Sequence, residues 1–176
     1  MKWLIASDLH GSAACCEAML AAFEREGADR LLLLGDVLSP GSRTGKETVA
    51  GMLGGMKDRV ICVRGNCDTD ADQTLLGFPL QEGYIALPVG GGRTVFATHG
   101  HIYNSGSLPP GLGAGDILLQ GHTHVPQTSN YGTNCCFNPG SVAQPRFGSE
   151  RGYMTMEEGL FRWLTLDGEE YRSYEL

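Results

Sequence analysis

Histidine residues gather in three short segments of this 176-residue sequence, and each segment has the spacing of metal ligands. The five histidines are His10, His99, His101, His122 and His124. Histidines used only for packing would be scattered along the chain. In an extended segment, residues two apart aim their side chains at the same face. The pattern therefore indicates imidazole rings that converge on a metal ion.

Oxygen ligands accompany the histidines at the ends of apolar runs. Asp8 follows the run 3–6, Asp36 follows Leu31–Leu34, and Asn66 follows Val60–Val63. Open α/β sheets place their sites at the carboxyl ends of strands, where such residues would meet. A mixed nitrogen and oxygen set suits Mn²⁺, Fe²⁺ or Zn²⁺ better than Ca²⁺ or Mg²⁺. We therefore predict a transition-metal centre at this edge.

The first half of the chain has the periodicity of alternating strands and helices. Buried strands are predicted at residues 2–7, 31–34 and 60–63, with helices at 14–26 and 46–56 between them. Ser12 offers an N-cap to the first helix, and Gly27 ends it. Strands that alternate with helices in this way are typical of a parallel sheet with crossover helices.

The second half is richer in strands. A hairpin is predicted from segments 84–87 and 94–98 around the glycines 90–92. Further short strands are predicted at 117–120, 135–138, 153–157, 160–166 and 171–174. We therefore predict a single domain over residues 1–176, built from two packed sheets, because the length also fits one domain.

Composition narrows the class of protein. The chain is 41% hydrophobic and 19% charged, which describes an ordinary globular protein, and its net charge of −7 argues against a basic surface for nucleic acids or membranes. No apolar run is long enough to span a bilayer, and the N-terminal run ends at Asp8 like a strand rather than a signal peptide. The six cysteines include two adjacent pairs and no Cys-x-x-Cys spacing, which favours reduced thiols and a cytoplasmic location.

Six local strings together resemble the motifs of one enzyme family. They are Ser-Asp-Leu-His-Gly-Ser (7–12), Leu-Gly-Asp-Val-Leu (34–38), Val-Arg-Gly-Asn-Cys-Asp (63–68), Thr-His-Gly-His (98–101), Gly-His-Thr-His (121–124) and Phe-Asn-Pro-Gly-Ser-Val (137–142). Each is weak alone, but their order over the whole chain resembles the calcineurin-like metallophosphoesterases. Within that superfamily, the chain is similar to the YfcE-type bacterial phosphodiesterases.

The resemblance implies a four-layer α/β/β/α sandwich of two mixed sheets with a dinuclear metal centre between loops at one end. One ion would be held by Asp8, His10, Asp36 and His124, and the other by Asp36, Asn66, His99 and His122, with Asp36 bridging. The implied cofactors are two divalent transition-metal ions, with Mn²⁺ favoured over Fe²⁺, Ni²⁺ or Zn²⁺. The implied reaction is hydrolysis of a small phosphodiester by a metal-bound hydroxide, and the likeness also suggests a homo-oligomer.

The sequence allows more than one role for several residues near these motifs. We assign Cys67 and His101 to the catalytic group with Asp36 and Asn66. Cys67 stands where many superfamily members have a histidine that protonates the leaving group, so it predicts better activity on esters with good leaving groups, such as aryl diesters. His101 either orients a substrate phosphate or is a polar loop residue.

Four further features are left open. Asp68 could orient a ligand or a thiol, and Arg64 could pair with phosphate or lock a loop. The segment Asn138–Ser141 predicts a turn near the site, and residues 105–113 predict a wall of the cleft or an oligomer contact.

Three alternative functions share the same core. A phosphomonoesterase would differ only in the walls of its pocket. A non-catalytic scaffold of this fold would tolerate the loss of several ligands, whereas this chain keeps the full set of seven. A nuclease would need a track of Lys and Arg around the motifs, which the sequence lacks.

Overall fold

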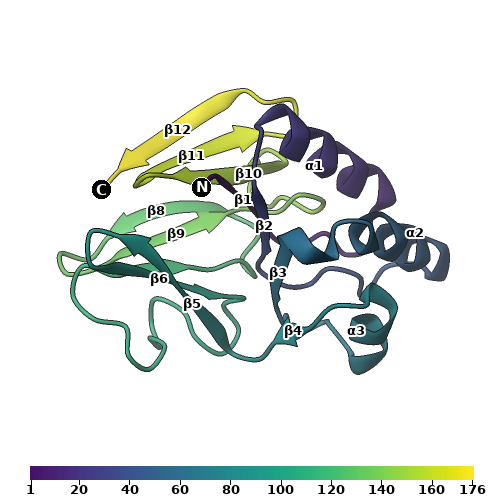
Figure 1. Cartoon of the computed structure of the whole chain (residues 1–176), viewed down its shortest axis with the longest axis horizontal. Coiled ribbons are helices and arrows are strands. Elements are labelled where there is room, and N and C mark those ends of the chain that lie inside the picture. Colours follow the sequence, from purple (N-terminus) through teal and green to yellow (C-terminus); the bar gives the residue numbers. More distant parts are fainter.

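The computed structural model describes residues 1–176 as two packed β-sheets with three α-helices and one short 3-10 helix (Figure 1). The larger sheet has seven strands in the order β12-β11-β10-β1-β2-β3-β4. They are β1 (Trp3–Ala6), β2 (Arg30–Leu33), β3 (Val60–Val63), β4 (Leu80–Gln81), β10 (Gly152–Glu157), β11 (Leu160–Thr165) and β12 (Glu170–Glu175). Strands β1 to β4 pair in parallel, and β10 to β12 extend the sheet in antiparallel fashion.

The smaller sheet has five strands in the order β5-β6-β7-β9-β8. They are β5 (Tyr84–Gly90), β6 (Arg93–Thr98), β7 (Ile117–Leu119), β8 (Pro126–Asn130) and β9 (Cys135–Pro139). β6, β7 and β9 run parallel, with an antiparallel strand at each edge. Both sheets are therefore mixed, as predicted.

Alternation along the central strands fixes the layers. Leu4 and Ala6 of β1 pack in the cluster under the helices, whereas Ile5 between them packs in the cluster between the two sheets. β2 divides its leucines in the same way, since Leu31 and Leu33 face the helices. These strands read as continuous apolar runs because both of their faces are covered.

Three helices cover the outer face of the larger sheet: α1 (Ala13–Arg25), α2 (Arg43–Gly54) and α3 (Asp70–Leu76), together with the 3-10 helix η1 (Lys57–Arg59). The Ser12 side chain accepts a hydrogen bond from the Cys15 N–H, so the predicted N-cap of α1 is confirmed. Helix α2 begins at Arg43 rather than Lys46, because Ser42 caps it by accepting from the Gly45 N–H. A low-propensity segment thus becomes helical once a cap and a packed face support it.

The prediction missed α3, β8 and the two-residue strand β4. Helix α3 is short and depends on a reciprocal capping box between Thr69 and Asp72, which a search for long apolar periodicity passes over. Strand β8 is the polar segment Pro-Gln-Thr-Ser-Asn, which is half-buried and pairs with β9. Its strand conformation comes from that pairing rather than from its own propensity.

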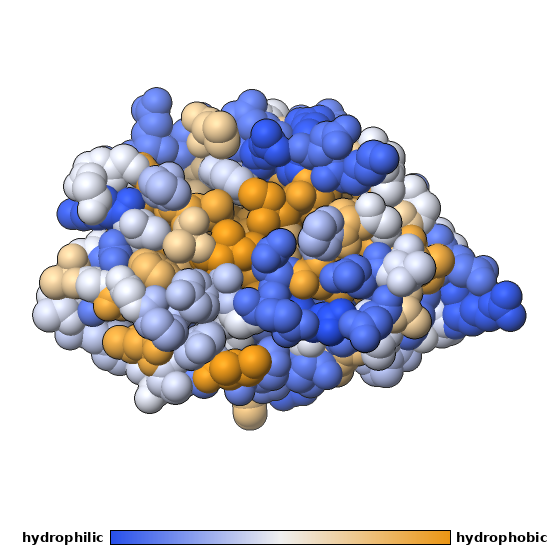
Figure 2. All heavy atoms as spheres, turned by 60° about the horizontal axis from the view of Figure 1, so that its bottom comes forward, coloured by the Kyte–Doolittle hydropathy of each residue, from blue (hydrophilic) through white to orange (hydrophobic).

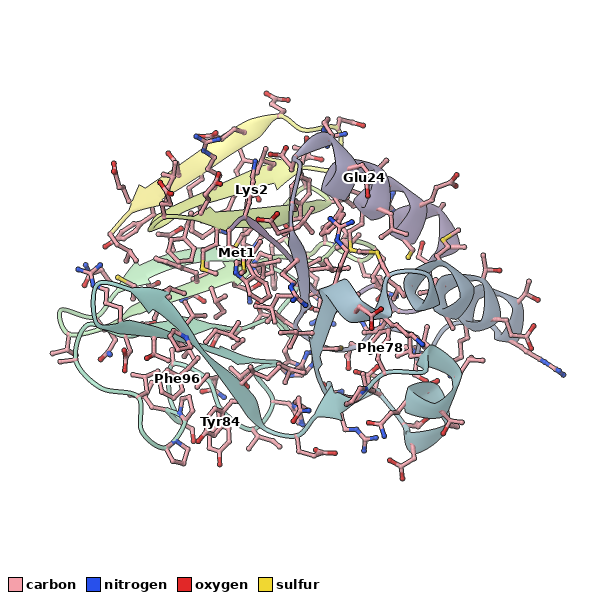
Figure 3. The ribbon with its side chains drawn as sticks, viewed as in Figure 1. Met1, Lys2, Glu24, Phe78, Tyr84 and Phe96 are labelled. Atoms are coloured by element: carbon pink, nitrogen blue, oxygen red, sulfur yellow. The ribbon has the colours of Figure 1, made fainter.

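The outer face of the smaller sheet is covered by the segment 99–116, which contains no helix. Leu112 of this segment packs with Tyr84 against a small cluster around Phe96, and the Tyr84 hydroxyl donates to the Pro110 carbonyl at 3.1 Å. Figure 3 shows Tyr84 and Phe96 lying together here, with their ring centroids 5.7 Å apart. The α/β class with two packed mixed sheets is confirmed, and the layer over the second sheet is coil because its glycines and prolines disfavour a helix.

Two further features concern the surface and the thiols. Figure 2 shows a band of apolar surface across the face that lies at the bottom of Figure 1, bordered by hydrophilic side chains. Such bands are typical of contact surfaces between proteins, and the predicted homo-oligomer stays a prediction. All six cysteines are free thiols. No helix is long and apolar enough to cross a bilayer.

Candidate metal centre

The predicted ligands lie on loops that follow parallel strands. Asp8 follows β1, Asp36 follows β2, and Asn66 follows β3 in the larger sheet, while His99 follows β6 and His122 follows β7 in the smaller one. The carboxyl ends of parallel strands meet at one edge, which brings these loops together. The structure therefore assembles residues that are far apart in the sequence at one end of the two sheets.

Backbone hydrogen bonds tie these loops to each other. The amide of Asp8 donates to the Gly35 carbonyl at 3.1 Å, and the amide of His10 donates to the Asp36 carbonyl at 2.9 Å. Across the two sheets, the amide of His122 donates to Asp8 Oδ2 at 3.1 Å. The loops that carry Asp8, Asp36 and His122 are thereby held against one another by hydrogen bonds within the protein.

Close packing explains why a glycine precedes three of the predicted ligands. A Cβ atom at Gly65 would overlap the carboxylate of Asp36, and one at Gly121 would overlap the Ser7 hydroxyl and crowd Asp8. The loops can approach this closely only where no side chain is present. The dipeptides Gly65-Asn66 and Gly121-His122 are therefore geometric requirements of the site.

Backbone strain is concentrated at the same residues. Seven residues other than glycine have positive φ, and five of them are predicted ligands: Asp8, His10, Asp36, His122 and His124, with φ between 47° and 65°. Such residues rarely adopt this conformation, and they cluster at functional sites where the surrounding structure enforces it. The strain therefore marks these loops as built for function.

Three imidazole rings are oriented by the same kind of hydrogen bond. The Nδ1 atoms of His10, His99 and His124 lie 2.7, 2.7 and 2.6 Å from the backbone carbonyls of Ser39, Leu34 and Gln144, respectively. A carbonyl oxygen only accepts, so each Nδ1 carries a proton and the neutral ring presents a lone pair at Nε2. Carbonyl partners of this kind commonly fix the tautomer of metal-ligating histidines.

One group of ligand atoms forms around Asp8. The ligand atoms of Asp8, His10 and His124 lie within 4.8 Å of one another. His10 Nε2 and His124 Nε2 are 3.4 Å apart, and His124 Nε2 lies 3.1 Å from Asp8 Oδ1. With Nδ1 protonated in both rings, neither neutral Nε2 can donate to the other, so a proton or a cation must satisfy the pair.

A second group forms around Asp36. His99 Nε2 lies 3.0 Å from Asn66 Oδ1 and 3.5 Å from Asp36 Oδ2. Asp36 also lies between the two groups, since its Oδ2 is 3.9 Å from His10 Nε2. The position of Asp36 is the one that a bridging ligand would need.

The donor set fits a divalent transition metal. Asp8 Oδ1 is fully buried and makes no hydrogen bond, although it faces His124. A buried carboxylate oxygen without a partner carries a desolvation cost that a metal ion would remove. Imidazole, carboxylate and carboxamide ligands together match Mn²⁺, Fe²⁺, Ni²⁺ or Zn²⁺.

The carboxylates shift the pKa values of the imidazoles around them. Burial lowers the pKa of His99, but hydrogen bonding to Asp36 and the charge of that carboxylate raise it above its ordinary value. The Asp8 carboxylate, whose Oδ1 lies 3.1 Å from His124 Nε2, raises the pKa of His124 in the same way. Burial opposes the change at Asp36, yet His99 and Cys67 hold the pKa of this carboxyl well below its usual range. Protons and metal ions therefore compete for the same nitrogens.

The remaining predicted residues lie beside these groups. The His122 ring centroid lies 5.0 Å from that of His99, and the His101 centroid lies 5.3 Å from it. His101 is exposed at the margin of the site. Cys67 Sγ lies within 4.8 Å of ligand atoms of His10 and Asp36. Burial and then the hydrogen bond and charge of Asp36 raise the pKa of the Cys67 thiol to about 12.

Asp68 holds the Asp36 loop through its backbone. The Asp68 carboxylate accepts from the amides of Asp36 at 2.8 Å, Val37 at 2.9 Å and Gly65 at 2.8 Å. Of the two roles left open for Asp68, orientation of a ligand is therefore the one that the contacts support.

Arg64 and the segment Asn138–Ser141 hold loops near the site in place. Arg64 pairs with Asp70 at 2.6 Å and with Glu82 at 3.0 Å, so it locks a loop rather than facing the site. Asn138 donates to the Gly121 carbonyl at 2.8 Å, and Ser141 donates to the Asp8 carbonyl at 2.9 Å. Asn138 and Pro139 end β9 rather than lie in the predicted turn, and this strand end with Ser141 holds two ligand loops in place.

A cleft of about 490 Å³ opens onto these residues. Its lining includes His10, Asp36, Asn66, Cys67, His122 and His124, together with Pro40, Thr123, Val125, Gln144, Arg146 and Phe147. Residues 105–113 do not line it. Sequence reasoning missed Arg146, the only Lys or Arg of the lining, and Phe147. Their sole signal was a position shortly after the Asn138–Ser141 turn.

Comparisons with known proteins agree with this geometry. The model of the calcineurin-like phosphoesterase superfamily domain matches residues 1–159. The chain is 38% identical over 173 residues to the phosphodiesterase YfcE of Escherichia coli strain K12, covering 95% of this chain and 93% of the relative.

Solved structures show the same relationship. A structure of the E. coli phosphoesterase YfcE matches with a TM-score of 0.91 and 35% identity over 99% of both chains. Vacuolar protein sorting 29 from Cryptosporidium parvum matches with a TM-score of 0.65 at 17% identity over 99% of this chain and 98% of that one, which shows a shared fold alone. The predicted family and its class of enzyme are confirmed: this chain belongs to the calcineurin-like phosphoesterase superfamily.

Proposed function

We propose that this chain hydrolyses small phosphodiesters at a centre that holds two divalent transition-metal ions. One ion would be held by Asp8, His10 and His124, the other by Asn66, His99 and His122, with Asp36 shared between them. We favour Mn²⁺ as the bound metal. Metal analysis of the purified protein would distinguish it from the alternatives Fe²⁺, Ni²⁺ and Zn²⁺. The similarity to phosphodiesterase YfcE supports the diester as substrate.

One observation carries the proposal. Three histidines are locked by backbone carbonyls so that each neutral ring turns its Nε2 lone pair toward two buried carboxylates. With its proton on Nδ1, the neutral His124 ring has no Nε2 proton to donate to Asp8 Oδ1, although the two atoms are 3.1 Å apart, so without a cation this buried oxygen has no partner. The arrangement is costly unless cations occupy it.

When bound, a pair of such ions supplies an activated water as the nucleophile and neutralises charge on the phosphate. The residues contribute position and electrostatics. Asp36 provides an anionic group with two oxygens, whereas Asn66 offers a carbonyl oxygen that adds no charge to repel the phosphate. Arg146 places a positive charge at the cleft, close enough to His124 to oppose the rise in its pKa. We assign Arg146 to a phosphate oxygen of the substrate.

Cys67 shapes the choice of leaving group. In metal-free protein, burial and then the Asp36 carboxylate raise the pKa of the Cys67 thiol to about 12, so it keeps its proton at neutral pH. A thiol is also a weak hydrogen-bond donor, which makes Cys67 a poor proton donor to a departing alkoxide. His101, whose pKa is lowered first by burial and then by the charges of His99 and His122, is the other candidate for contact with the phosphate. We therefore expect aryl diesters to react faster than alkyl diesters.

The test is a panel of substrates on protein stripped by a chelator and reloaded with one metal at a time. Bis(4-nitrophenyl) phosphate, 4-nitrophenyl phosphate and single-stranded DNA represent diester, monoester and nucleic acid. We expect turnover of the aryl diester with Mn²⁺ and little with the other two. Faster monoester turnover would make the chain a phosphomonoesterase, and no turnover with any metal would favour a scaffold.

The compartment follows from the thiols. Six free cysteines, four of them buried, support a reducing environment, and we propose the cytoplasm.

A further inference from the structure

An exposed phenylalanine stands at the cleft in a conformation that its side chain disfavours. Phe147 is 94% exposed, and its φ is +54°. A bulky residue with positive φ is an outlier, because its Cβ crowds the backbone. An exposed ring also gains nothing from burial. Neither the backbone nor the ring of Phe147 therefore benefits the fold, which points to a role outside folding.

The turn that carries Phe147 is one that glycine would suit. The Ser149 amide donates to the Arg146 carbonyl at 3.1 Å, and both central residues, Phe147 and Gly148, have positive φ. This is the pattern of a type I′ turn, in which Asn, Asp or Gly is preferred at the first central position. Phenylalanine occupies that position despite the strain.

The turn is fastened to a proposed metal ligand. The Arg146 amide donates to the His124 carbonyl at 3.3 Å, and the Ser149 hydroxyl lies 3.4 Å from the same oxygen. The His124 ring in turn donates from Nδ1 to the Gln144 carbonyl at 2.6 Å. The aromatic ring is thus presented on a support that is continuous with the metal centre.

Phe147 lines the same cleft as the candidate ligands. The cleft of about 490 Å³ is of the size that holds small organic molecules. Pro40 and Val125 also line it and add apolar surface near the metal centre. A phosphodiester whose phosphate lies among the ligands must extend its ester groups into this cleft.

We propose that Phe147 determines substrate specificity by stacking on an aromatic ring carried by an ester group of the substrate, such as a phenyl group or a nucleobase. This inference rests on the proposed function, because it assumes that the phosphate binds among the ligands. A ligand whose planar ring stacks on an aromatic side chain such as Phe147 binds about tenfold more tightly than one without such a ring. A small alkyl group offers no such face.

The test compares phenylphosphonate with methylphosphonate, whose phosphorus–carbon bonds resist hydrolysis. Their dissociation constants are measured by calorimetry on Mn²⁺-loaded protein. The wild type is expected to bind the phenyl compound about tenfold more tightly. Phe147→Gly accepts the positive φ and so preserves the turn, yet it should abolish this preference and leave methylphosphonate binding unchanged. Phe147→Leu keeps apolar bulk without a planar face and should lose most of the preference.

Tyr131→Ala serves as the matched control, because Tyr131 is a 56% exposed aromatic residue outside the cleft lining. It should keep the full preference. A wild type that binds both phosphonates equally, or a Phe147→Gly variant that retains the preference, overturns the proposal. A change in oligomeric state without a change in preference would make Phe147 a protein contact and also overturn it. A wild type that prefers phenylphosphonate but cleaves no diester would leave the stacking intact and refute the proposed reaction.

Discussion

Replacing Asp36 with asparagine removes a charge from the candidate centre while keeping its shape. Asp36 Oδ1 accepts the Cys67 amide at 2.8 Å, and a carboxamide oxygen can do the same. Asp36 Oδ2 lies 3.5 Å from His99 Nε2 and 3.9 Å from His10 Nε2, so a cation bound to those nitrogens is close to the lost charge. A pair of unit charges at about 4 Å is worth about 4 kcal/mol at an effective dielectric constant of 20, and a divalent cation interacts at least this strongly, so the figure is a lower bound. Mn²⁺ binding should therefore weaken by at least about a thousandfold.

The measurement is calorimetric titration of Mn²⁺ into chelator-treated protein, with circular dichroism to establish that the variant is folded. Asp116→Asn is the matched control. Its carboxylate also accepts backbone amides, from Thr94 and Gly113 at 2.8 Å each, but it precedes β7 at the end away from the site. The control should bind Mn²⁺ like the wild type. A folded Asp36→Asn protein with wild-type Mn²⁺ affinity would refute the bridging role.

Three further predictions follow from the same contacts. In metal-free protein, the raised pKa values of His99 and His124 mean that the folded state holds their protons more tightly than the unfolded state. This stability is complete below the ordinary histidine pKa of about 6.5 and is lost as pH rises through the raised values. The lowered pKa values of His101 and His122 add stability as pH rises to about 6.5 and change it little above pH 7. Thermal melting with chelator should therefore occur at lower temperature at pH 8.5 than at pH 7, by roughly 2–4 °C per kcal/mol lost. Mn²⁺ should remove this fall, and an unchanged melting temperature would contradict the assignment. Gly121→Ala should lower the free energy of unfolding by about 1–3 kcal/mol in a urea titration, because the added Cβ would overlap the Ser7 side chain. The control Gly51→Ala places its Cβ in open space on α2 and should raise the free energy of unfolding by about 0.5–1 kcal/mol. Equal effects of the two substitutions would show that the ligand loops are not tightly packed. Asp68→Asn leaves one acceptor oxygen for the three backbone amides that the carboxylate binds. The affinity for Mn²⁺, measured by calorimetry, should therefore fall about 10- to 100-fold. An unchanged affinity would mean that Asp68 does not position Asp36.

The sequence by itself determined the family, the two-sheet class and the set of candidate ligands. The ligands can be recognised in the sequence because they lie within a few residues of the end of an apolar strand, as Asp36 lies two residues after Leu34, and strand ends are local features. The tight glycine dipeptides belong to the same local signal. Helix boundaries moved where a cap decided them, as at Ser42 of α2.

Only the tertiary structure decided how the ligands are oriented and what surrounds them. The Nδ1 partners of His10 and His124 are carbonyls 29 and 20 residues away, so no local pattern could reveal the tautomers. The same is true of Arg64, whose partners Asp70 and Glu82 settled its role, and of Phe147, whose exposure at the cleft depends on the turn bound to His124. The periodicity of a strand depends on residues that are neighbours in the sequence. The site, in contrast, is formed by side chains that come together only when the two sheets pack.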